Sequence, residues 1–256
     1  MRVRLLPSRA GSDSQLQALT TFVVNESLAI DGGSLGFALP PQEMKAFRNI
    51  IVTHAHSDHT ASLPIFVAEV FPELDGPVTI YGLPEVVSAL REFVFNDHIW
   101  PDFEKIALGN GGGPAIRFTE LEARQQISIG GVTVKPIPVN HVVPTAGLIL
   151  GDGRASVAFT SDTYTTDEIW RAAREVEGLK AIFVDVSYPN EMEELAAASK
   201  HLTPQSLASD LRKLEREVEI LAVHIKPSHR DQVISQLGLL SDPRVRVAEI
   251  GRVYEW

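Results

Sequence analysis

The chain contains no cysteine among its 256 residues, which excludes disulfides, cysteine-ligated zinc and thiol nucleophiles. It also lacks an apolar run near the roughly 18 residues that a membrane-spanning helix needs. Its first residues carry charges but no sustained apolar segment of the kind found in a signal peptide. We therefore expect a cytoplasmic protein with no membrane partner.

Basic residues are scarce: 23 lysines and arginines stand against 33 aspartates and glutamates, a formal net charge of −10. No basic run offers the face that long nucleic acids need for phosphate contacts, so polymeric nucleic acid is not an expected partner. A small anionic substrate remains compatible with this charge if a bound metal ion supplies local positive charge.

Apolar residues are plentiful, at 44% of the chain, which is enough to bury a large core. Short apolar runs alternate with helical patterns and no linker interrupts them, so we predict one domain over residues 1–256. Two rounds of strands followed by helices predict an α/β sandwich of two sheets with helices outside. The patterns also predict a helix over 60–71, a capping box at 165–168 and a helix start at Thr203-Pro204.

The densest group of ligand-type residues is the segment 53–59, Thr-His-Ala-His-Ser-Asp-His. His54 and His56 are two residues apart, so an extended backbone turns both imidazoles to one face. Asp58 and His59 follow, where the chain enters a predicted helix. Imidazole and carboxylate suit zinc, manganese or iron, so the segment predicts a metal site. The alternative is a solvent-facing polar loop, which would need these offsets to arise by chance.

Three further ligand-type residues, His141, Asp162 and His224, each follow a predicted apolar strand and precede a turn. Taken singly, each is more typical of an ordinary loop residue. Together with the 53–59 segment they complete a set of ligands for two metal ions.

The order His-x-His-x-Asp-His, a single His, a single Asp and a final His resembles the metallo-β-lactamase superfamily. The resemblance implies a four-layer αββα sandwich that binds two divalent metal ions. Zinc is the expected metal, and manganese or iron would also be compatible. It implies that Asp162 bridges both ions. The implied ligands are His54, His56, His141 and Asp162 for one ion, and Asp58, His59, Asp162 and His224 for the other.

Segments 95–103, 187–204 and 223–227 resemble the class II cyclic-nucleotide phosphodiesterases of this superfamily. The resemblance implies hydrolysis of a 3′,5′-cyclic nucleotide (cAMP or cGMP) to a 5′-nucleotide, with a small-molecule nucleotide as the partner. The sequence is also compatible with a homodimer. Asp185 stands where the resemblance leads us to expect a glutamate, and the shorter side chain is expected to weaken a contact behind a metal ligand.

The predicted catalytic residues are Asp58 and His201. His201 resembles a histidine of the tRNase Z branch and is a candidate general acid, because imidazole titrates near neutrality. The alternative is that His201 packs beside the helix that begins at Pro204. Asp31 either orients a metal-binding histidine or forms a turn.

The candidate substrate contacts are Asn96, Trp100 and Asn140. Trp100, with Phe95 and Phe103, would stack on a nucleobase, and Asn96 would bind the edge of that base. Core packing is the alternative for these aromatic residues. Asn140 is expected either to contact the phosphate or to orient His141.

The alternative functions are a tRNase Z-like enzyme or another metallo-β-lactamase-fold hydrolase. Residues 60–135 carry five basic against ten acidic residues, so they do not form an RNA-gripping arm. A non-catalytic metal-binding module is disfavoured, because all seven ligands are present.

Overall fold

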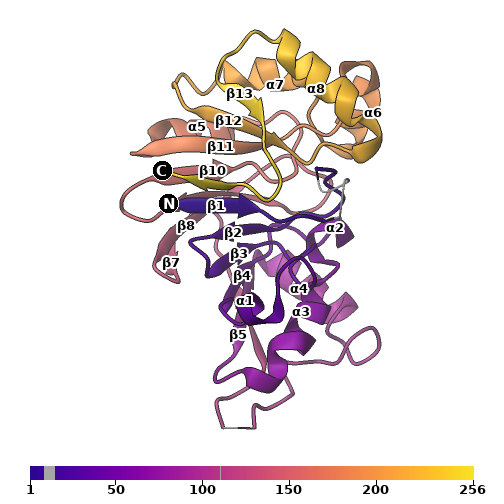
Figure 1. Ribbon diagram of the computed structural model, residues 1–256, viewed down its shortest axis with the longest axis vertical. Coiled ribbons are helices and arrows are strands. Elements are labelled where there is room, and N and C mark those ends of the chain that lie inside the picture. The colour runs from indigo at the N-terminus through magenta and orange to yellow at the C-terminus, as the bar shows by residue number, and fades with distance from the viewer. Residues whose placement is uncertain (9–14, 110) are drawn as a thin grey trace.

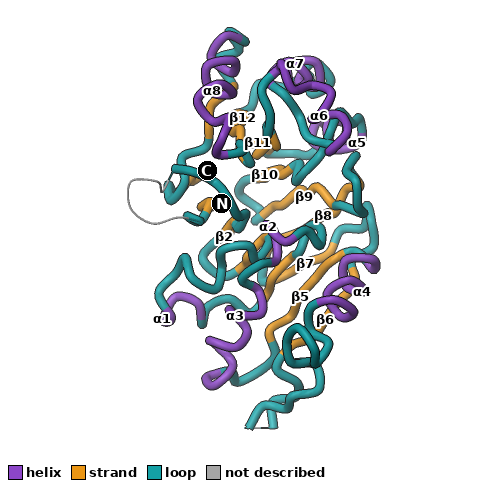
Figure 2. The backbone as a smooth tube through the Cα atoms, turned by 90° about the vertical axis from the view of Figure 1, so that its right-hand side faces the viewer, coloured by secondary structure: helices purple, strands orange, loops and turns teal. Residues whose placement is uncertain are grey.

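The computed structural model describes residues 1–8, 15–109 and 111–256. Within these residues the strands form two seven-stranded sheets that pack face to face, with helices on both outer sides (Figure 1). The chain thus has the predicted αββα architecture. The two chain ends lie side by side, because the first and last strands pair with each other (Figure 2).

The first sheet is antiparallel at one end and parallel at the other. Strands β14, β1, β2 and β3 are antiparallel neighbours, whereas β3, β4, β5 and β6 run parallel. The strands, in sheet order, are β14 (Val253–Glu255), β1 (Arg2–Leu5), β2 (Phe22–Val24), β3 (Leu28–Ile30), β4 (Asn49–Ile51), β5 (Val78–Gly82) and β6 (Ile116–Glu120). The helices in this half are α1 (Pro41–Met44), α2 (Ser57–Thr60), α3 (Leu63–Val70) and α4 (Pro84–Phe93).

The second sheet mirrors this arrangement, with β7 to β10 antiparallel and β10 to β13 parallel. Its strands, in sheet order, are β13 (Val245–Val247), β12 (Glu219–Val223), β11 (Leu179–Asp185), β10 (Ser156–Phe159), β9 (Ala146–Gly151), β8 (Val132–Pro138) and β7 (Ile127–Ile129). Helices α5 (Glu168–Glu175), α6 (Glu193–Ser199), α7 (Pro204–Leu211) and α8 (Arg230–Leu239) lie in this half. Across the described ranges, no helix has the length and apolar character needed to cross a membrane.

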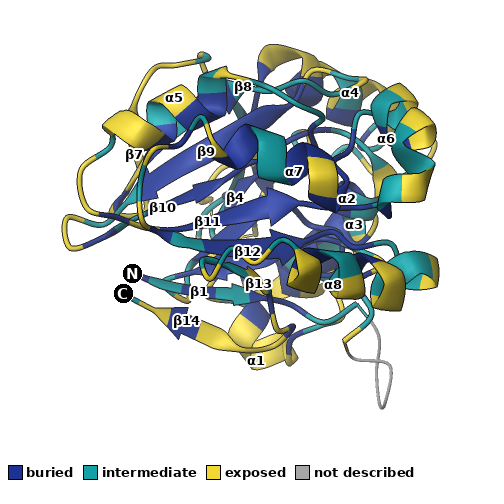
Figure 3. Cartoon of the chain, turned by 90° about the horizontal axis from the view of Figure 1, so that it is seen from above, coloured by how far each residue is buried: buried dark blue, intermediate teal, exposed yellow. Residues whose placement is uncertain are grey.

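The core has two parts, one between the sheets and one beneath the helices of the second sheet. Between the sheets, Phe22 packs edge-on against Phe159 and Phe183 at ring-centroid distances of 5.0 and 5.1 Å. Under the helices, Trp170 is fully buried and its indole nitrogen donates to Asp210 Oδ2 at 2.9 Å. Burial of each such side chain contributes about 1.5–3 kcal/mol, and Figure 3 shows the buried strands between more exposed helices.

One local prediction is confirmed with a later start, and one is wrong. The helix predicted over 60–71 is α3 (Leu63–Val70), which begins three residues later than predicted, because Pro64 has no N–H to continue the hydrogen-bond ladder from α2 and lies in the first turn of α3. The capping box predicted at 165–168 is absent: α5 begins at Glu168, and the Asp167 side chain makes no cap hydrogen bond. The helix start at Thr203-Pro204 is confirmed, since Thr203 Oγ1 accepts from the Ser206 amide at 3.2 Å.

Candidate metal centre

The seven predicted ligands converge at one end of the sandwich, in the loops that follow β4, β8, β10 and β12. Three residues near this end have backbone in the left-handed region: Asp31 (φ 62°) directly after β3, Ser161 (φ 55°) shortly after β10, and His224 (φ 59°) directly after β12. Such backbone is strained for side chains other than glycine, and strain of this kind is concentrated at functional sites.

The first ligand set consists of His54, His56, His141 and Asp162, and its donor atoms all lie within 4.8 Å of one another. His56 Nδ1 lies 3.1 Å from His54 Nε2 and 3.2 Å from His141 Nε2. Two zinc ligands at ordinary bond lengths in a tetrahedral site lie about 3.3 Å apart. The spacing of these three imidazole nitrogens therefore fits one metal ion.

The second ligand set consists of Asp58, His59, Asp162 and His224, with donor atoms again within 4.8 Å of one another. His224 Nε2 lies 3.2 Å from Asp58 Oδ2, and His59 Nε2 lies 3.4 Å from Asp162 Oδ1. His59 Nε2 is buried and has no hydrogen-bond partner among the described residues. A buried nitrogen without a partner is costly, and a cation between His59 and the two aspartates would satisfy it.

Asp162 belongs to both sets. Its Oδ2 lies 3.6 Å from the Nε2 atoms of both His54 and His224, while its Oδ1 faces His59. This placement matches the predicted bridging role. The two sets together suit a binuclear metal site, and the residue types leave the identity of the metal open.

Asp31 orients a ligand, which resolves the two alternatives that the sequence left open. Its Oδ2 lies 2.7 Å from His59 Nδ1, and its Oδ1 accepts hydrogen bonds from the amide and the hydroxyl of Thr53. A carboxylate on one ring nitrogen fixes the imidazole so that the other nitrogen faces the metal position.

Gly33 lets the loop after β3 approach the loop that carries the first ligands. A Cβ atom at Gly33 would lie 2.1 Å from the Asp58 carbonyl oxygen, which no real side chain tolerates. Backbone hydrogen bonds from Thr20 to Asp58 and from Gly32 to His59 fasten the two loops together. The position of the second ligand set therefore depends on glycine at 33.

Asp185 anchors two histidines through a hydrogen-bond network that the sequence did not reveal. Its Oδ2 lies 2.7 Å from His201 Nδ1, and its Oδ1 accepts from the Ser187 hydroxyl at 2.7 Å. Ser187 Oγ in turn lies 2.9 Å from His224 Nδ1. Asp185 thus contacts His201 directly and His224 through Ser187. The contact behind a metal ligand, which we expected the shorter aspartate side chain to weaken, is therefore formed.

His201 stands beside both ligand sets. Its ring centroid is 5.2 Å from that of His141 and 5.4 Å from that of His224, with which it is stacked. Its donor atom also lies within 4.8 Å of those of Asp162, Asp185 and His224. The His201 side chain is thus a buried neighbour of the candidate metal centre, and its role as a general acid stays a prediction.

The two ligand sets differ in their protonation. Burial lowers the pKa of His54 well below its ordinary value and also lowers the pKa of His56 and His141. Burial opposes charge in the second set too, but Asp162 and Asp31 raise the pKa of His59 well above its ordinary value.

His224 follows the same pattern as His59. Burial acts to lower its pKa, but the charge of Asp162 and the nearby carboxylates of Asp185 and Asp58, at 3.6 and 3.2 Å from its ring nitrogens, raise that pKa to about 9. The burial of Asp162 is likewise outweighed by His224 and His59, which hold the pKa of this carboxyl well below its usual range.

Asn140 has a role that we did not predict. Its side-chain amide donates to the Thr165 carbonyl at 2.9 Å, and its backbone amide donates to Thr163 Oγ1 at 3.1 Å. It therefore holds the loop that follows Asp162. The residue that orients His141 is Lys200, whose carbonyl oxygen lies 3.1 Å from His141 Nδ1.

The aromatic platform predicted at 95–103 is largely core. Phe95 and Phe103 are buried at 1% and 6% exposure, so neither ring is free to stack on a base. The Asn96 side chain is engaged in its own loop, where Oδ1 accepts from the amides of His98 and Ile99. Trp100 packs partly buried against the core, and its contact with substrate stays a prediction.

Lys226 is a further neighbour that sequence reasoning did not select. Its Nζ lies 3.6 Å from Asp58 Oδ2, so it brings a positive charge to the edge of the second ligand set. The only sequence signal was its place in segment 223–227, two residues after His224. A lysine beside a metal centre is suited to an anionic substrate.

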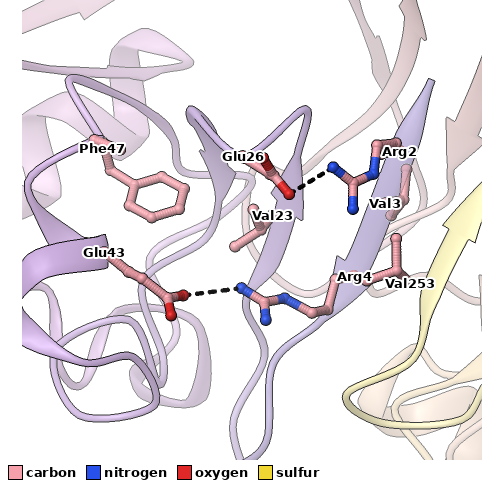
Figure 4. Close-up of a pocket in the computed structure, with 9 residues that line it drawn as sticks. Arg2, Val3, Arg4, Val23, Glu26, Glu43, Phe47 and Val253 are labelled. Atoms are coloured by element: carbon pink, nitrogen blue, oxygen red, sulfur yellow. Dashed lines mark hydrogen bonds and ion pairs between the residues drawn. The ribbon is translucent and has the colours of Figure 1, made fainter.

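A surface cavity of about 500 Å³ lies apart from the ligands, between β1, β2, β14 and the segment of α1 (Figure 4). Its two arginines are each paired with a glutamate: Arg2 with Glu26 at 2.6 Å, and Arg4 with Glu43 at 3.5 Å. None of the seven predicted ligands lines this cavity, so it is separate from the candidate metal centre.

Comparison with known proteins adds family evidence to this geometry. Residues 27–225 match the family described as the β-lactamase superfamily domain. A "probable 3′,5′-cyclic-nucleotide phosphodiesterase" of Yersinia pestis is 27% identical over 207 residues, which cover 72% of this chain and 58% of that protein. A 3′,5′-cyclic-nucleotide phosphodiesterase of Schizosaccharomyces pombe is 29% identical over 180 residues, covering 68% of this chain and 46% of that protein.

The chain therefore spans about half the length of the curated relatives that it matches. Among solved structures, unliganded yeast PDE1 superposes with a TM-score of 0.76 at 18% identity, covering 98% of each chain. At this identity the likeness concerns the fold.

Proposed function

This chain belongs to the metallo-β-lactamase superfamily, and we propose that it is a two-metal phosphodiesterase that hydrolyses 3′,5′-cyclic nucleotides such as cAMP and cGMP to 5′-nucleotides. The observation that carries the proposal is the pair of ligand sets joined by Asp162, with His201 beside both. Distant relatives that are named cyclic-nucleotide phosphodiesterases support the choice of substrate.

Two divalent ions bound by the two ligand sets would neutralise the charge of a phosphoryl group and activate water. We expect zinc, with manganese or iron as the alternatives. The protein supplies the orientation of the ligands. Asp31 holds His59 by its Nδ1 atom, and Ser187 holds His224 in the same way, so that the Nε2 atoms face the metal positions. Asp162 ties the two positions to each other.

His201 is proposed to donate the proton that the leaving oxygen takes up. Its Nδ1 is hydrogen-bonded to Asp185 at 2.7 Å, and this contact fixes the ring so that its Nε2 atom is left to carry the proton for the leaving oxygen. As water adds to phosphorus, the bond from phosphorus to the 3′-oxygen breaks and the 3′-oxygen takes the proton of His201. The product is a 5′-nucleotide.

Asp58 is proposed to accept a proton from the attacking water. Its side chain is 28% exposed, whereas that of Asp162 is 3% exposed. Asp58 is therefore the more open of the two carboxylates in the second ligand set. The neighbouring Lys226 would attract the anionic substrate to this side of the site.

The partner in this proposal is a small-molecule nucleotide rather than a polymeric nucleic acid, given the net charge of −10. A homodimer remains compatible with it. The test is a substrate panel of cAMP, cGMP, linear dinucleotides and precursor tRNA, with protein loaded with zinc, manganese or iron. We expect 5′-nucleotide from the cyclic substrates and little processing of tRNA. Efficient tRNA processing without turnover of cyclic nucleotides would contradict the proposal.

A further inference from the structure

Four rings lead outward from the buried end of the second ligand set: His224, His201, Tyr188 and His229, here called the ring row. His201 stacks on His224 at a centroid distance of 5.4 Å. The Tyr188 ring follows at 5.9 Å from His201, and the His229 ring at 6.2 Å from Tyr188. The ring row thus connects a metal ligand and the proposed general acid with two aromatic side chains farther out.

Burial decreases along the ring row. His224 and His201 are buried at 7% exposure each, whereas Tyr188 and His229 are only half-buried. Within the described ranges, the Tyr188 hydroxyl and the His229 ring nitrogens form no hydrogen bond or ion pair, and the only recorded contacts of their side chains are ring contacts. Neither of these side chains is therefore held by a hydrogen bond to another part of the described chain.

The backbone holds the outer two rings in place. Tyr188 follows the buried Ser187, which is fastened to Asp185 and His224. His229 lies in the short helical turn Pro227–His229 at the start of α8, and its amide donates to the Lys226 carbonyl at 2.9 Å. The same segment carries Lys226, whose Nζ reaches Asp58. A substrate that meets this cation is thus next to the aromatic pair.

We propose that Tyr188 and His229 form the subsite for the nucleobase of the cyclic nucleotide, an inference that rests on the proposed function. When the phosphate lies at the ligand sets and its 3′-oxygen meets His201, the rest of the nucleotide extends along the ring row. Aromatic side chains stack on the π-face of any base, and this stacking depends little on the hydrogen-bonding groups at the edge of the base. The subsite therefore accepts both adenine and guanine.

The alternative platform is Trp100, which the sequence suggested together with Phe95 and Phe103. Those two rings are part of the core, and Trp100 packs against the same core. The ring row differs because it begins at His224, a predicted metal ligand, and passes through His201, the proposed general acid. The two platforms make separate predictions for the variants below.

The experiment compares cAMP with ribose 3′,5′-cyclic phosphate, which has the same phosphodiester but no base. For Tyr188→Leu we expect KM for cAMP to rise about tenfold, the usual effect of losing one base–ring stack, with kcat nearly unchanged. The base-free substrate should show no change.

Tyr188→Phe is the matched control that keeps the ring, and it should retain the KM of the wild type. His229→Leu should raise KM for cAMP alone, and Trp100→Leu should not.

Three results would overturn the subsite: no change in KM for Tyr188→Leu, equal losses on both substrates, or a rise in KM for cAMP with Trp100→Leu instead. Circular dichroism and metal content identify a variant that has lost its fold or its ions. If Tyr188→Leu is such a variant, His229→Leu carries the test, and an unchanged KM for cAMP in His229→Leu then overturns the subsite. If the wild type hydrolyses neither substrate, the proposed function fails. Calorimetric titration with 5′-AMP then still tests the subsite, which requires weaker binding by Tyr188→Leu than by the wild type.

Discussion

The two ligand sets share Asp162, but they hold their histidines in opposite states of charge. In the first set, burial lowers the pKa of His54, His56 and His141, so these imidazoles are neutral at pH 7. In the second set, neighbouring carboxylates outweigh burial and raise the pKa of His59 and His224. The first set is therefore ready for a cation, whereas the second must exchange protons for one.

The cause lies in what stands behind each ring. His54 Nδ1 faces the Thr53 hydroxyl at 3.1 Å, and His141 Nδ1 faces a backbone carbonyl at the same distance, both uncharged partners. His59 instead lies between Asp31 and Asp162. We therefore expect the two metal positions, although similar in composition, to differ in how their affinity for a cation depends on pH.

The change with the largest expected effect removes the residue common to both sets. Asp162→Ala takes a ligand from each metal position, so both ions should be lost or displaced and turnover should fall below detection. Elemental analysis and an assay with cAMP measure the two effects.

Asp75→Ala is the matched control, because Asp75 is an exposed carboxylate with 87% side-chain exposure, paired with Arg48. This variant should keep its metal content and its activity. An Asp162→Ala protein that retains both ions and near wild-type turnover would show that Asp162 does not bridge.

His201 belongs to neither set, and its removal should separate chemistry from metal binding. His201→Ala should lower kcat by about 10²–10⁴, the usual span for losing a general acid, with metal content unchanged. The loss should be smaller for a substrate whose leaving group is p-nitrophenolate, because this group barely needs a proton. Equal losses on both substrates would assign His201 a structural or phosphate-binding role.

Ser187→Ala should affect one set alone. It removes the partner of His224 Nδ1 and the link to Asp185, so affinity at the second metal position should fall about 10–100-fold. The first position should be unaffected. Competition with a chelator measures both steps, and Ser209→Ala, on the outer helix α7, is the control. A matching loss at the first position would contradict the separation of the two sets.

The difference in protonation predicts different pH dependences. Because the pKa of His224 is about 9 and that of His59 is also raised, a cation at the second position must displace their protons, and affinity there should rise at least about tenfold per pH unit between pH 7 and 9. Affinity at the first position should change little over this range. Chelator competition at several pH values measures both slopes, and equal slopes would remove the distinction.

The same shift affects the stability of the metal-free protein. The folded pKa of His224 is raised from 6.5 to about 9, so its stabilising effect is fully present below pH 6.5 and is lost as the pH rises through about 9. The melting temperature of metal-free protein should therefore fall by a few degrees over this interval. Metal-loaded protein should not show this fall. The two melting curves, recorded at matched pH, test the expectation.

Much of the candidate site was accessible from the sequence, because its signals are local. The spacing of His54 and His56 and the position of the ligands after apolar strands need only the geometry of an extended chain. Contacts between distant parts of the chain are less accessible. The Asn140 side chain is bonded to the Thr165 carbonyl, and Phe95 is enclosed by the core, as the alternative of core packing predicts. Neither contact has a local signal, because both depend on how separate segments pack.

The sequence by itself determined the residue types of the ligands, their order and the two-layered alternation of strands and helices, because these follow from short-range periodicity. Only the tertiary structure decided which groups stand behind the ligands. Asp31 is 28 residues from His59, Asp185 is 16 from His201, and Ser187 is 37 from His224. Contacts over such separations depend on how the two sheets pack. The protonation of each histidine is set by those contacts, because charge and desolvation act through space and not along the chain.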